Sequence, residues 1–297
     1  MRQHGSAVKV HLLDATWELF RAHFGRPEER DPDGRLVSAT IGLVESTLAL
    51  LREPGVTHLG AATDHVIRSF RNDLYAGYKT EAGMPPELLA QFELAERALE
   101  ALGVVVWPMV EFEADDALAT AAAGWANEPG VEQVVICSPD KDLAQCVDGR
   151  RVVQLDRLRG TVTDGDGVWT RFGVTPASIP DYLALVGDSA DGYPGLPGWG
   201  KTSTAAAVGR YGTLEAIPAR ASAWDVPVRG AVRLAATLRE CWQEALLYRE
   251  LARLCRDVPL ARALDDLRWR GARRGEYLAL CDELGAARLR DRPHLWQ

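Results

Sequence analysis

Short runs of hydrophobic residues alternate along the first half of the chain with longer segments in which hydrophobic residues recur every three or four positions. The short runs predict β-strands, at residues 7–13, 57–63, 103–107, 132–137 and about 151–155. The longer segments predict helices, at residues 36–52, 87–102 and 114–126. Because alternating strands and helices are typical of a mostly parallel sheet with helices on both faces, we expect an α/β fold.

The pattern changes after about residue 175. Gly and Pro interrupt the remaining hydrophobic segments at short intervals, and none of these segments reads clearly as a strand. A sequence of this kind favours short helices joined by turns. We therefore expect an α/β part over about 1–175 and a second, helical part after it.

The composition is that of an ordinary globular protein. Hydrophobic residues make up 47% of the 297 residues and charged residues 26%, which suits one large core or two smaller ones. The five cysteines form no CxxC pair, which excludes a disulfide framework and a thiolate zinc site. No hydrophobic run is long enough to span a membrane, and the N-terminus does not resemble a signal peptide. We expect a cytoplasmic protein with no membrane contact.

The net charge of −8 argues at first against a nucleic-acid partner, because proteins that bind nucleic acids are usually basic. The charge is unevenly distributed, however. Residues 1–191 have 17 basic and 30 acidic side chains, a net charge of −13, whereas residues 192–297 have 17 and 12, a net charge of +5. The basic last third of the chain therefore leaves an anionic partner open.

Three aspartates closely follow predicted strands: Asp14, Asp64 and Asp140. In open α/β sheets ligands bind in the crevice outside the carboxyl ends of the strands, so we expect these three side chains to converge there. A single aspartate in such a position is more often the cap of a turn or helix. Only the joint pattern favours a functional site.

Six further acids extend this pattern, all at helix or loop boundaries. They are Glu113, Asp115, Asp116, Asp142, Asp188 and Asp191. Neighbouring carboxylates repel one another, by about 1 kcal/mol per pair at about 4 Å even in water, so a crevice lined by them needs cations. Oxygen ligands suit Mg²⁺ or Mn²⁺, and two such ions are typical of enzymes that cleave phosphodiesters.

A second motif predicts a different function. Residues 195–202, GLPGWGKT, match the G-x-x-x-x-G-K-[ST] loop of P-loop NTPases. That loop works where a strand leads straight into it, whereas the nearest hydrophobic run, 183–186, ends well before Gly195. Pro194 and Pro197 also offer no N–H group to a phosphate. A P-loop NTPase stays an alternative, and the same backbone N–H groups are equally suited to a DNA phosphate.

Five stretches carry a family resemblance, in an order and spacing that extend from residue 7 to about 285. They are VHLLDATWELFRAHF (10–24), ATDHVIRSFRNDLYAGYK (62–79), VEFEADDALAT (110–120), ICSPDKDLAQCV (136–147) and DYLALVGDSADGYPGLPGWGKTSTA (181–205). Together they resemble the 5′-nuclease (flap endonuclease) family, and especially the 5′→3′ exonuclease domain of bacterial DNA polymerase I. No polymerase module follows, so the chain resembles a stand-alone member.

The resemblance implies a fold and a domain order. The α/β nuclease core, of the PIN-like or resolvase-like kind, would occupy residues 1–175, with a helical arch near residues 70–90. A helix-three-turn-helix region that binds DNA would occupy residues 176–258. The C-terminal segment, residues 259–297, would pack back on the core.

The resemblance also implies roles for individual side chains. All nine carboxylates match metal ligands of the family. Lys79 matches a lysine that contacts the scissile phosphate, and Tyr78 matches a residue whose ring stacks on a base. Arg21 and Arg71 match arginines that hold phosphates near the metals, although each is nearly as well explained as the ion-pair partner of a neighbouring carboxylate.

The glycine-rich turn is the last implied site. The segment 193–210 matches the helix-three-turn-helix, whose turn presents backbone groups to a DNA strand, and we expect a potassium ion at this turn. Its DNA-binding residues would be Gly195, Gly198, Gly200, Lys201 and Thr202.

The implied activity is that of a structure-specific 5′-nuclease that hydrolyses DNA by a two-metal-ion mechanism with Mg²⁺ or Mn²⁺. The substrate would be DNA with a 5′ end, a nick or a flap, in replication and repair. We expect a monomer that shares its substrate with a separate DNA polymerase. A non-catalytic DNA-binding relative and an RNA-directed nuclease are alternatives. The complete set of carboxylates disfavours the first, and the helix-three-turn-helix match disfavours the second.

Overall fold

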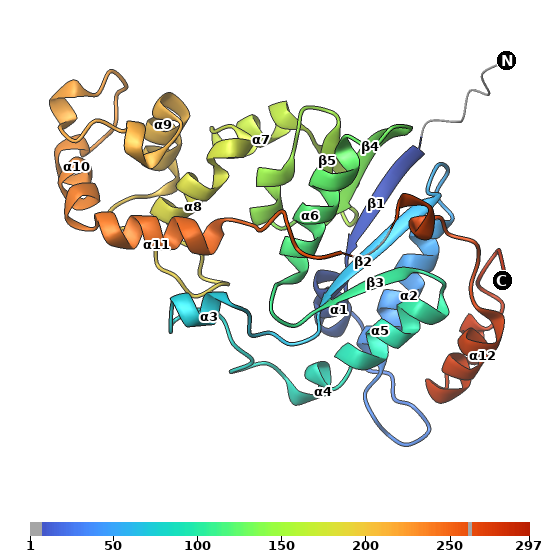
Figure 1. Ribbon diagram of the computed structural model, residues 1–297. Coiled ribbons are helices and arrows are strands. Elements are labelled where there is room, and N and C mark those ends of the chain that lie inside the picture. Colours follow the sequence, from blue (N-terminus) through green and yellow to red (C-terminus); the bar gives the residue numbers. More distant parts are fainter. Residues whose placement is uncertain (1–7, 261–262) are drawn as a thin grey trace, which may run out of the picture. The chain divides into compact units, whose positions relative to one another are not determined.

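The computed structural model describes residues 8–260 and 263–297, and these residues form two compact units (Figure 1). Unit 1 comprises the described residues of Met1–Ile67, Glu81–Ser138 and Cys255–Gln297. Unit 2 comprises Arg68–Thr80 and Pro139–Leu254. The N-terminal residues 1–7, including the first position of the strand predicted at 7–13, lie outside the described residues.

Four parallel strands form the sheet of unit 1, in the order β3-β2-β1-β4. They are β1 (Val8–Asp14), β2 (His58–Asp64), β3 (Val105–Met109) and β4 (Val131–Cys137). Every residue of β2 is buried, as expected for a parallel strand that is covered on both faces. The parallel sheet predicted from the hydrophobic runs is confirmed.

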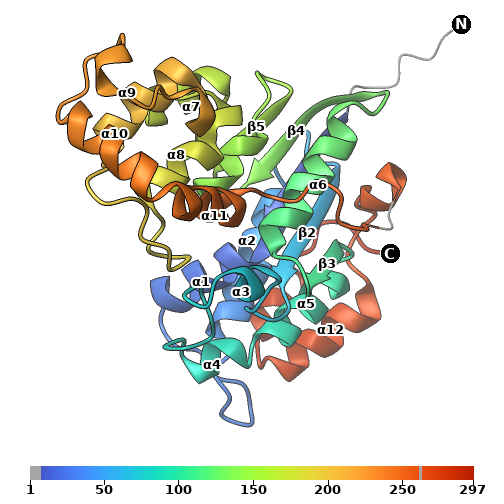
Figure 2. The same cartoon turned by 60° about the vertical axis from the view of Figure 1, so that its left-hand side comes forward.

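Helices cover both faces of this sheet (Figure 2). The chain runs from β1 through α1 (Ala15–Gly25) and α2 (Ser38–Leu51) to β2, and then through α5 (Phe92–Ala101) to β3. The helix α6 (Ala114–Ala126) carries it back across the sheet to β4, on the other side of β1. Because crossovers between parallel strands are right-handed, this reversal puts α6 on the opposite face from α1, α2 and α5. The point of reversal, between β1 and β4, is where open α/β sheets bind ligands.

The single helix predicted over 87–102 is wrong, because this stretch contains two helices, α4 (Pro86–Leu89) and α5. Gln91 lies between them, and its buried side chain is held by hydrogen bonds. Its Nε2 donates to the carbonyl oxygen of Glu87, and its Oε1 accepts the N–H of Thr40 in α2. This second bond joins residues far apart in the sequence, so hydrophobic periodicity cannot show it.

Unit 2 contains a short antiparallel pair, β5 (Val152–Asp156) and β6 (Thr161–Thr163). The sequence predicts β5 but misses β6, because three residues are too few to show an alternating pattern. The turn between them is stabilised by Asp156, whose Oδ1 accepts the N–H groups of Leu158 and Arg159 at 3.0 Å.

The remainder of unit 2 is helical, as the sequence predicts, and within the described ranges no strand follows Thr163. Its helices are α3 (Arg71–Leu74), α7 (Gly165–Phe172), α8 (Ile179–Val186), α9 (Lys201–Tyr211), α10 (Ala231–Glu240) and α11 (Trp242–Ala252). The rings of Tyr193 and Tyr248 stack in the core of this unit, with centroids 5.6 Å apart. None of the described helices is long and apolar enough to cross a membrane.

The stretch predicted as a helical arch, residues 70–90, has little regular structure. It contains two four-residue helices, α3 in unit 2 and α4 in unit 1, and the backbone between them is not helical. On the unit 2 side the N–H of Lys79 donates to the carbonyl oxygen of Asp191 at 3.0 Å. The part of this stretch that belongs to unit 2 ends at Thr80 and is therefore tied, through Lys79, to the loop after α8.

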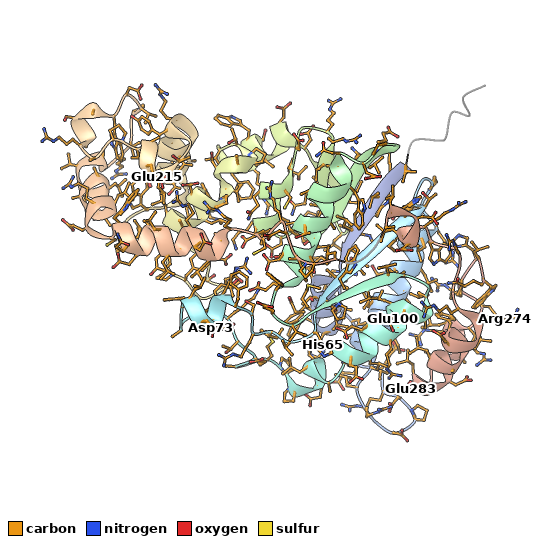
Figure 3. All side chains as sticks on the ribbon, viewed as in Figure 1. His65, Asp73, Glu100, Glu215, Arg274 and Glu283 are labelled. Atoms are coloured by element: carbon orange, nitrogen blue, oxygen red, sulfur yellow. The ribbon has the colours of Figure 1, made fainter. Side chains whose placement is uncertain are left out.

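The C-terminal residues form part of unit 1. The helix α12 (Arg274–Glu283) packs against α5. Glu283, labelled in Figure 3, accepts two hydrogen bonds from Arg97 of α5, at 2.9 and 3.1 Å. Upstream of α12, the indole N–H of Trp269 donates to the carbonyl oxygen of Leu102 at 2.7 Å.

Candidate metal centre and glycine-rich turn

Asp14 ends β1 and lies at the switch point between β1 and β4. Its Oδ1 accepts the N–H of Trp17 at 2.8 Å and so caps α1. Its Oδ2 accepts the hydroxyl of Ser138, directly after β4, at 2.7 Å. The same aspartate is therefore a helix cap and a carboxylate fixed at the edge of the sheet where a ligand is expected.

Asp64 ends the neighbouring strand β2 and contacts the start of α6. Its Oδ1 accepts the N–H of Ala114 at 2.8 Å, and its own N–H donates to Oγ1 of Thr16. Ala114 lies between Glu113 and Asp115 in the sequence. The hydrogen bond therefore brings Asp64 beside the acidic start of α6.

Glu113, Asp115 and Asp116 lie at the N-terminus of α6, where the helix dipole stabilises negative charge. Asp116 is fully buried, and both of its oxygens accept backbone N–H groups. Its Oδ2 accepts from Glu113 at 3.0 Å and its Oδ1 from Cys255 at 2.8 Å. Asp116 thus ties the C-terminal residues to α6, and its removal would disturb the fold as well as any metal site.

The other four predicted ligands lie in unit 2. One carboxylate oxygen from each of Asp142, Asp188 and Asp191 lies within 4.8 Å of the others, and all three side chains are buried. Asp140 contacts this group through its Oδ1, which accepts the N–H of Asp142 at 3.0 Å. The turn after β4 and the loop after α8 therefore supply one compact group of carboxylates.

The donor set of this group fits a hard divalent cation. Burial raises the pKa of Asp142 well above its usual range, and the nearby carboxylates, first that of Asp140, raise it further. The Oδ1 atom of Asp142 is buried and has no hydrogen-bond partner among the described residues. A cation coordinated by oxygen would satisfy this atom and offset the repulsion within the group.

Two lysines balance part of this negative charge. Lys141 forms an ion pair with Asp188, and the Nζ of Lys79 lies 3.2 Å from Oδ1 of Asp191. Burial acts to lower the pKa of Lys141, but the bond to Asp188 and the neighbouring carboxylates outweigh it, so the pKa is raised. Lys141 therefore stays charged in the neutral pH range.

The raised pKa of Asp142 predicts how the stability of the metal-free protein depends on pH. Above the ordinary pKa of an aspartate, the folded protein retains a proton that the unfolded chain has lost. The free energy of unfolding therefore falls as the pH rises through the pKa of the folded state. Thermal unfolding in EDTA at a series of pH values measures this slope. Asp142→Asn should make it shallower, and an unchanged slope would show that Asp142 is not its source.

Tyr78 and Lys79 are ordered by contacts within unit 2. The Nζ of Lys79 lies 5.6 Å from the centre of the Tyr78 ring, and Nδ2 of Asn72 donates to the carbonyl oxygen of Lys79 at 2.9 Å. The ring of Tyr78, predicted to stack on a base, is only 3% exposed and packs in the core of the unit. In this structure it is not presented to solvent.

The two predicted phosphate-binding arginines lie in different surroundings. Arg71 is 1% exposed, and its Nε and Nη2 donate to the carbonyl oxygens of Leu251 and Arg253 at 2.8 and 2.9 Å. Its guanidinium thus fixes the end of α11. Arg21 is partly exposed and forms an ion pair with the buried Glu18, the alternative that the sequence leaves open for it.

The glycine-rich turn joins α8 to α9. Gly195 has a φ of +69°, and a Cβ atom there would lie 2.4 Å from the backbone nitrogen of Gly187, so no other residue fits without moving the chain. Gly198 also has a positive φ, of +86°. The element that leads into this turn is the helix α8, not a strand. The local structure that a P-loop requires is therefore missing from this described stretch.

The start of α9 leaves backbone groups available to a ligand. Gly200 is the N-terminal cap, and the hydroxyl of Ser203 accepts its N–H at 3.1 Å. Lys201 and Thr202 form the first turn and are both exposed. The N–H groups of such a turn and the helix dipole favour an anion.

Sequence reasoning missed three residues that position the carboxylates: Ser138, Lys141 and Gln145. Gln145 donates through Nε2 to the carbonyl oxygen of Asp142 and accepts the N–H of Leu254 through Oε1. It therefore holds the turn that carries Asp142. A cation between two predicted ligands, as in Asp-Lys-Asp, was a signal that could have identified Lys141. Ser138 bonds to Asp14, which is distant in sequence, and Gln145 joins the nearby Asp142 to the distant Leu254.

Comparison with protein families matches nearly the whole chain. Residues 9–173 match the 5′-3′ exonuclease N-terminal resolvase-like domain, and residues 174–275 match the 5′-3′ exonuclease C-terminal SAM fold. The chain belongs to the 5′-3′ exonuclease family. Its fold, a resolvase-like α/β part with a helical C-terminal part, is the one that the sequence predicted.

Among curated relatives, DNA polymerase I of Mycobacterium leprae is 35% identical over 288 residues, which cover 95% of this chain and 31% of that protein. DNA polymerase I of Bacillus caldotenax is 32% identical, over 93% of this chain and 31% of that protein. The chain therefore spans less than a third of the length of these relatives.

Among solved structures, the bacteriophage T5 D15 flap endonuclease, in a complex with DNA and metal ions, has a TM-score of 0.63 at 14% identity. The alignment covers 82% of this chain and 88% of that one. The catalytic core of Rad2 in complex with DNA substrate has a TM-score of 0.58 at 14% identity, with 96% and 90% coverage. At such identities these likenesses support the fold.

Proposed function

We propose that this chain is a structure-specific 5′-nuclease that hydrolyses DNA phosphodiesters with divalent metal ions, as a 5′→3′ exonuclease and flap endonuclease. The observation that carries the proposal is the buried group formed by Asp142, Asp188 and Asp191, whose donor oxygens lie within 4.8 Å of one another. Membership of the 5′-3′ exonuclease family supports it. The solved relatives whose titles name DNA and metal ions give further support.

The proposed cofactors are two or more Mg²⁺ or Mn²⁺ ions, held by the nine carboxylates. The five in unit 1 are Asp14, Asp64, Glu113, Asp115 and Asp116, and the four in unit 2 are Asp140, Asp142, Asp188 and Asp191. Bound divalent ions lower the pKa of water and stabilise negative charge on a phosphate. A potassium ion at the glycine-rich turn is a separate part of the proposal.

The protein's own side chains would bind and orient the DNA. Lys79, now paired with Asp191, would turn to the scissile phosphate and stabilise the charge that develops there. Arg21 would hold a neighbouring phosphate, with Arg71 supporting the same region. The exposed start of α9 would bind the DNA backbone without regard to base sequence, because contacts to phosphates carry no sequence information.

The domain order predicted from the sequence is part of this proposal. It assigns residues 1–175 to the nuclease core, with the segment near 70–90 as an arch, residues 176–258 to DNA binding and residues 259–297 to a return onto the core. We further propose a monomer that acts in the cytoplasm during replication and repair. A separate DNA polymerase would act on the same 5′ ends, nicks and flaps.

The test is cleavage of 5′-labelled DNA duplexes that carry a nick, a gap or a flap, with Mg²⁺, Mn²⁺ or EDTA. We expect short products from the 5′ end with either metal and none in EDTA. Product lengths separate exonuclease from flap-endonuclease activity. Cleavage that persists in EDTA would contradict the metal-dependent mechanism, and binding without cleavage in any metal would favour the non-catalytic alternative.

A further inference from the structure

The loop that follows α8 (Figure 1) carries Asp188 and Asp191, two members of the buried carboxylate group of unit 2. Tyr193 closes this loop. The N–H of Asp188 donates to the carbonyl oxygen of Tyr193 at 2.8 Å, and the N–H of Tyr193 donates to the carbonyl oxygen of Asp188 at 3.0 Å. Residues directly opposite each other in such an antiparallel pair have their side chains on the same face, with Cβ atoms about 4.5–5.5 Å apart. The side chain of Tyr193 therefore lies beside that of Asp188.

Packing leaves the ring of Tyr193 little freedom. The residue is 1% exposed, and its ring stacks on that of Tyr248 in α11, with centroids 5.6 Å apart. The preceding residue, Gly192, lies so close to Gly77 that a Cβ atom would be 2.3 Å from the carbonyl oxygen of Gly77. Because both contacts hold the loop, the hydroxyl of Tyr193 has a fixed position.

The hydroxyl of Tyr193 is buried near carboxylates, and yet it has no hydrogen-bond partner among the described residues. Burial raises the pKa of Tyr193, and the carboxylates of Asp142, Asp191 and Asp188 raise it further, so the hydroxyl stays uncharged at neutral pH. A buried hydroxyl without a partner destabilises a protein, whereas phenylalanine would fill the same space at no such cost. The hydroxyl therefore indicates a partner that the described residues do not supply.

Asp142 has a complementary unsatisfied atom. Its Oδ1 is buried and has no hydrogen-bond partner within the part of the chain that the structure describes. The hydroxyl of Tyr193 does not bond to this oxygen, since such a bond would satisfy both groups. A hydrated cation would supply both partners at once, because the ion would bind the carboxylate oxygen and its water would bond to the hydroxyl. Mg²⁺ suits this arrangement, because it gives up its water reluctantly.

We propose that Tyr193 is a specificity-determining residue of the metal centre in unit 2, whose hydroxyl holds a water molecule of the bound ion and so favours Mg²⁺ over Ca²⁺. The hydroxyl oxygen accepts a hydrogen bond from that water. Ca²⁺ binds more oxygen ligands directly and in a more flexible geometry, so it gains less from a hydroxyl that contacts only its water. The inference rests on the proposed function and deepens it. Tyr193 takes part in no bond-making step, and its role is to position water while the carboxylates bind the ion.

The test uses the full chain without DNA. The rise in melting temperature on adding Mg²⁺ or Ca²⁺ gives the affinity for each ion. Tyr193→Phe removes only the hydroxyl, so we expect it to bind Mg²⁺ about 3–10-fold more weakly, as for the loss of one hydrogen bond, and to change the affinity for Ca²⁺ less than about twofold. In EDTA the variant should melt no lower than the wild type, because the hydroxyl bonds to none of the described residues.

Tyr182→Phe is the matched control. Tyr182 is another buried tyrosine of unit 2, in α8, but burial alone raises its pKa, with no contribution from a carboxylate. This variant should bind both ions as the wild type does. A second control places Tyr193→Phe in an Asp142→Asn background. There it should have little further effect on Mg²⁺ binding, because the ion whose water the hydroxyl holds is itself bound less tightly.

The outcomes separate this inference from the nuclease proposal. If Tyr193→Phe binds Mg²⁺ as tightly as the wild type, the inference is wrong while the nuclease proposal stands. An equal loss of affinity for Mg²⁺ and Ca²⁺ would mean that the hydroxyl acts on the carboxylates and not on water, and a lower melting temperature in EDTA would assign it to the fold; either result overturns the inference. If neither ion stabilises the wild type, the proposed metal centre fails first, and the inference fails with it.

Discussion

Asp142→Asn is expected to slow DNA cleavage by at least about a thousandfold and, at the same time, to stabilise the metal-free protein. Asparagine has the same shape but no charge, so it weakens the hold on a cation that is expected to stabilise the reacting phosphate by several kcal/mol. A loss of about 4 kcal/mol of that stabilisation is a factor of about a thousand in rate. The same change removes a buried carboxylate that its neighbours repel, so the apo protein should melt at a higher temperature.

The two readouts together exclude unfolding as the cause. Cleavage of a 5′-labelled flap in Mg²⁺ gives the rate, and thermal unfolding in EDTA gives the stability. Asp225→Asn is the control, since Asp225 is an exposed aspartate of unit 2 that pairs with Arg210. This control should cleave at the wild-type rate. A wild-type rate in Asp142→Asn, or a lower melting temperature, would remove Asp142 from the metal centre.

The overall charge of the chain acquires a different meaning once the carboxylates are assigned. Apart from the nine proposed ligands, the chain has 33 acidic and 34 basic residues. The acidity that argues against a nucleic-acid partner therefore belongs largely to the proposed metal site. In such a protein the distribution of charge is informative and its sum is not.

The sequence predicts most of the fold because each strand of the parallel sheet reads as a hydrophobic run, and β2 is buried along its whole length. β1, β2, β3 and β4 all lie where such runs occur. The predictions that fail concern single secondary-structure elements. Gln91 divides a predicted helix through a hydrogen bond to α2, and β6 is too short to show a pattern. Both depend on contacts that a periodicity in one segment cannot contain.

In the candidate site too, the residues that the sequence identifies are placed by their own strand, and the features that it misses depend on contacts with distant parts of the chain. Asp14 and Asp64 can be found from the sequence because the end of a strand fixes their position. Arg71 is buried against the carbonyl oxygens that end α11, and the hydroxyl of Tyr193 has no hydrogen-bond partner among the residues that the structure describes; both facts follow from tertiary packing. A residue type and its spacing identify a carboxylate site, whereas the partners of each side chain emerge only in the folded chain.

Lys79→Met is expected to lower the rate of cleavage at saturating DNA by about a hundredfold or more, while the protein binds divalent ions at least as tightly as before. Methionine keeps an unbranched apolar side chain but removes the charge proposed to stabilise the phosphate, and such preorganised groups are worth about 10²–10³ in rate. Metal binding should not suffer, because Lys79 now occupies Oδ1 of Asp191 at 3.2 Å and competes with a cation for that oxygen.

The comparison with Lys79→Arg separates charge from geometry. If charge alone matters, arginine restores most of the rate; if one compact ammonium group must reach the phosphate, arginine restores little. The rise in melting temperature on adding Mn²⁺ reports metal binding without reference to activity. A smaller rise in Lys79→Met than in the wild type would mean that the lysine supports the metal centre itself. Its effect on cleavage would then follow from lost cations, and a direct role at the phosphate would be unnecessary.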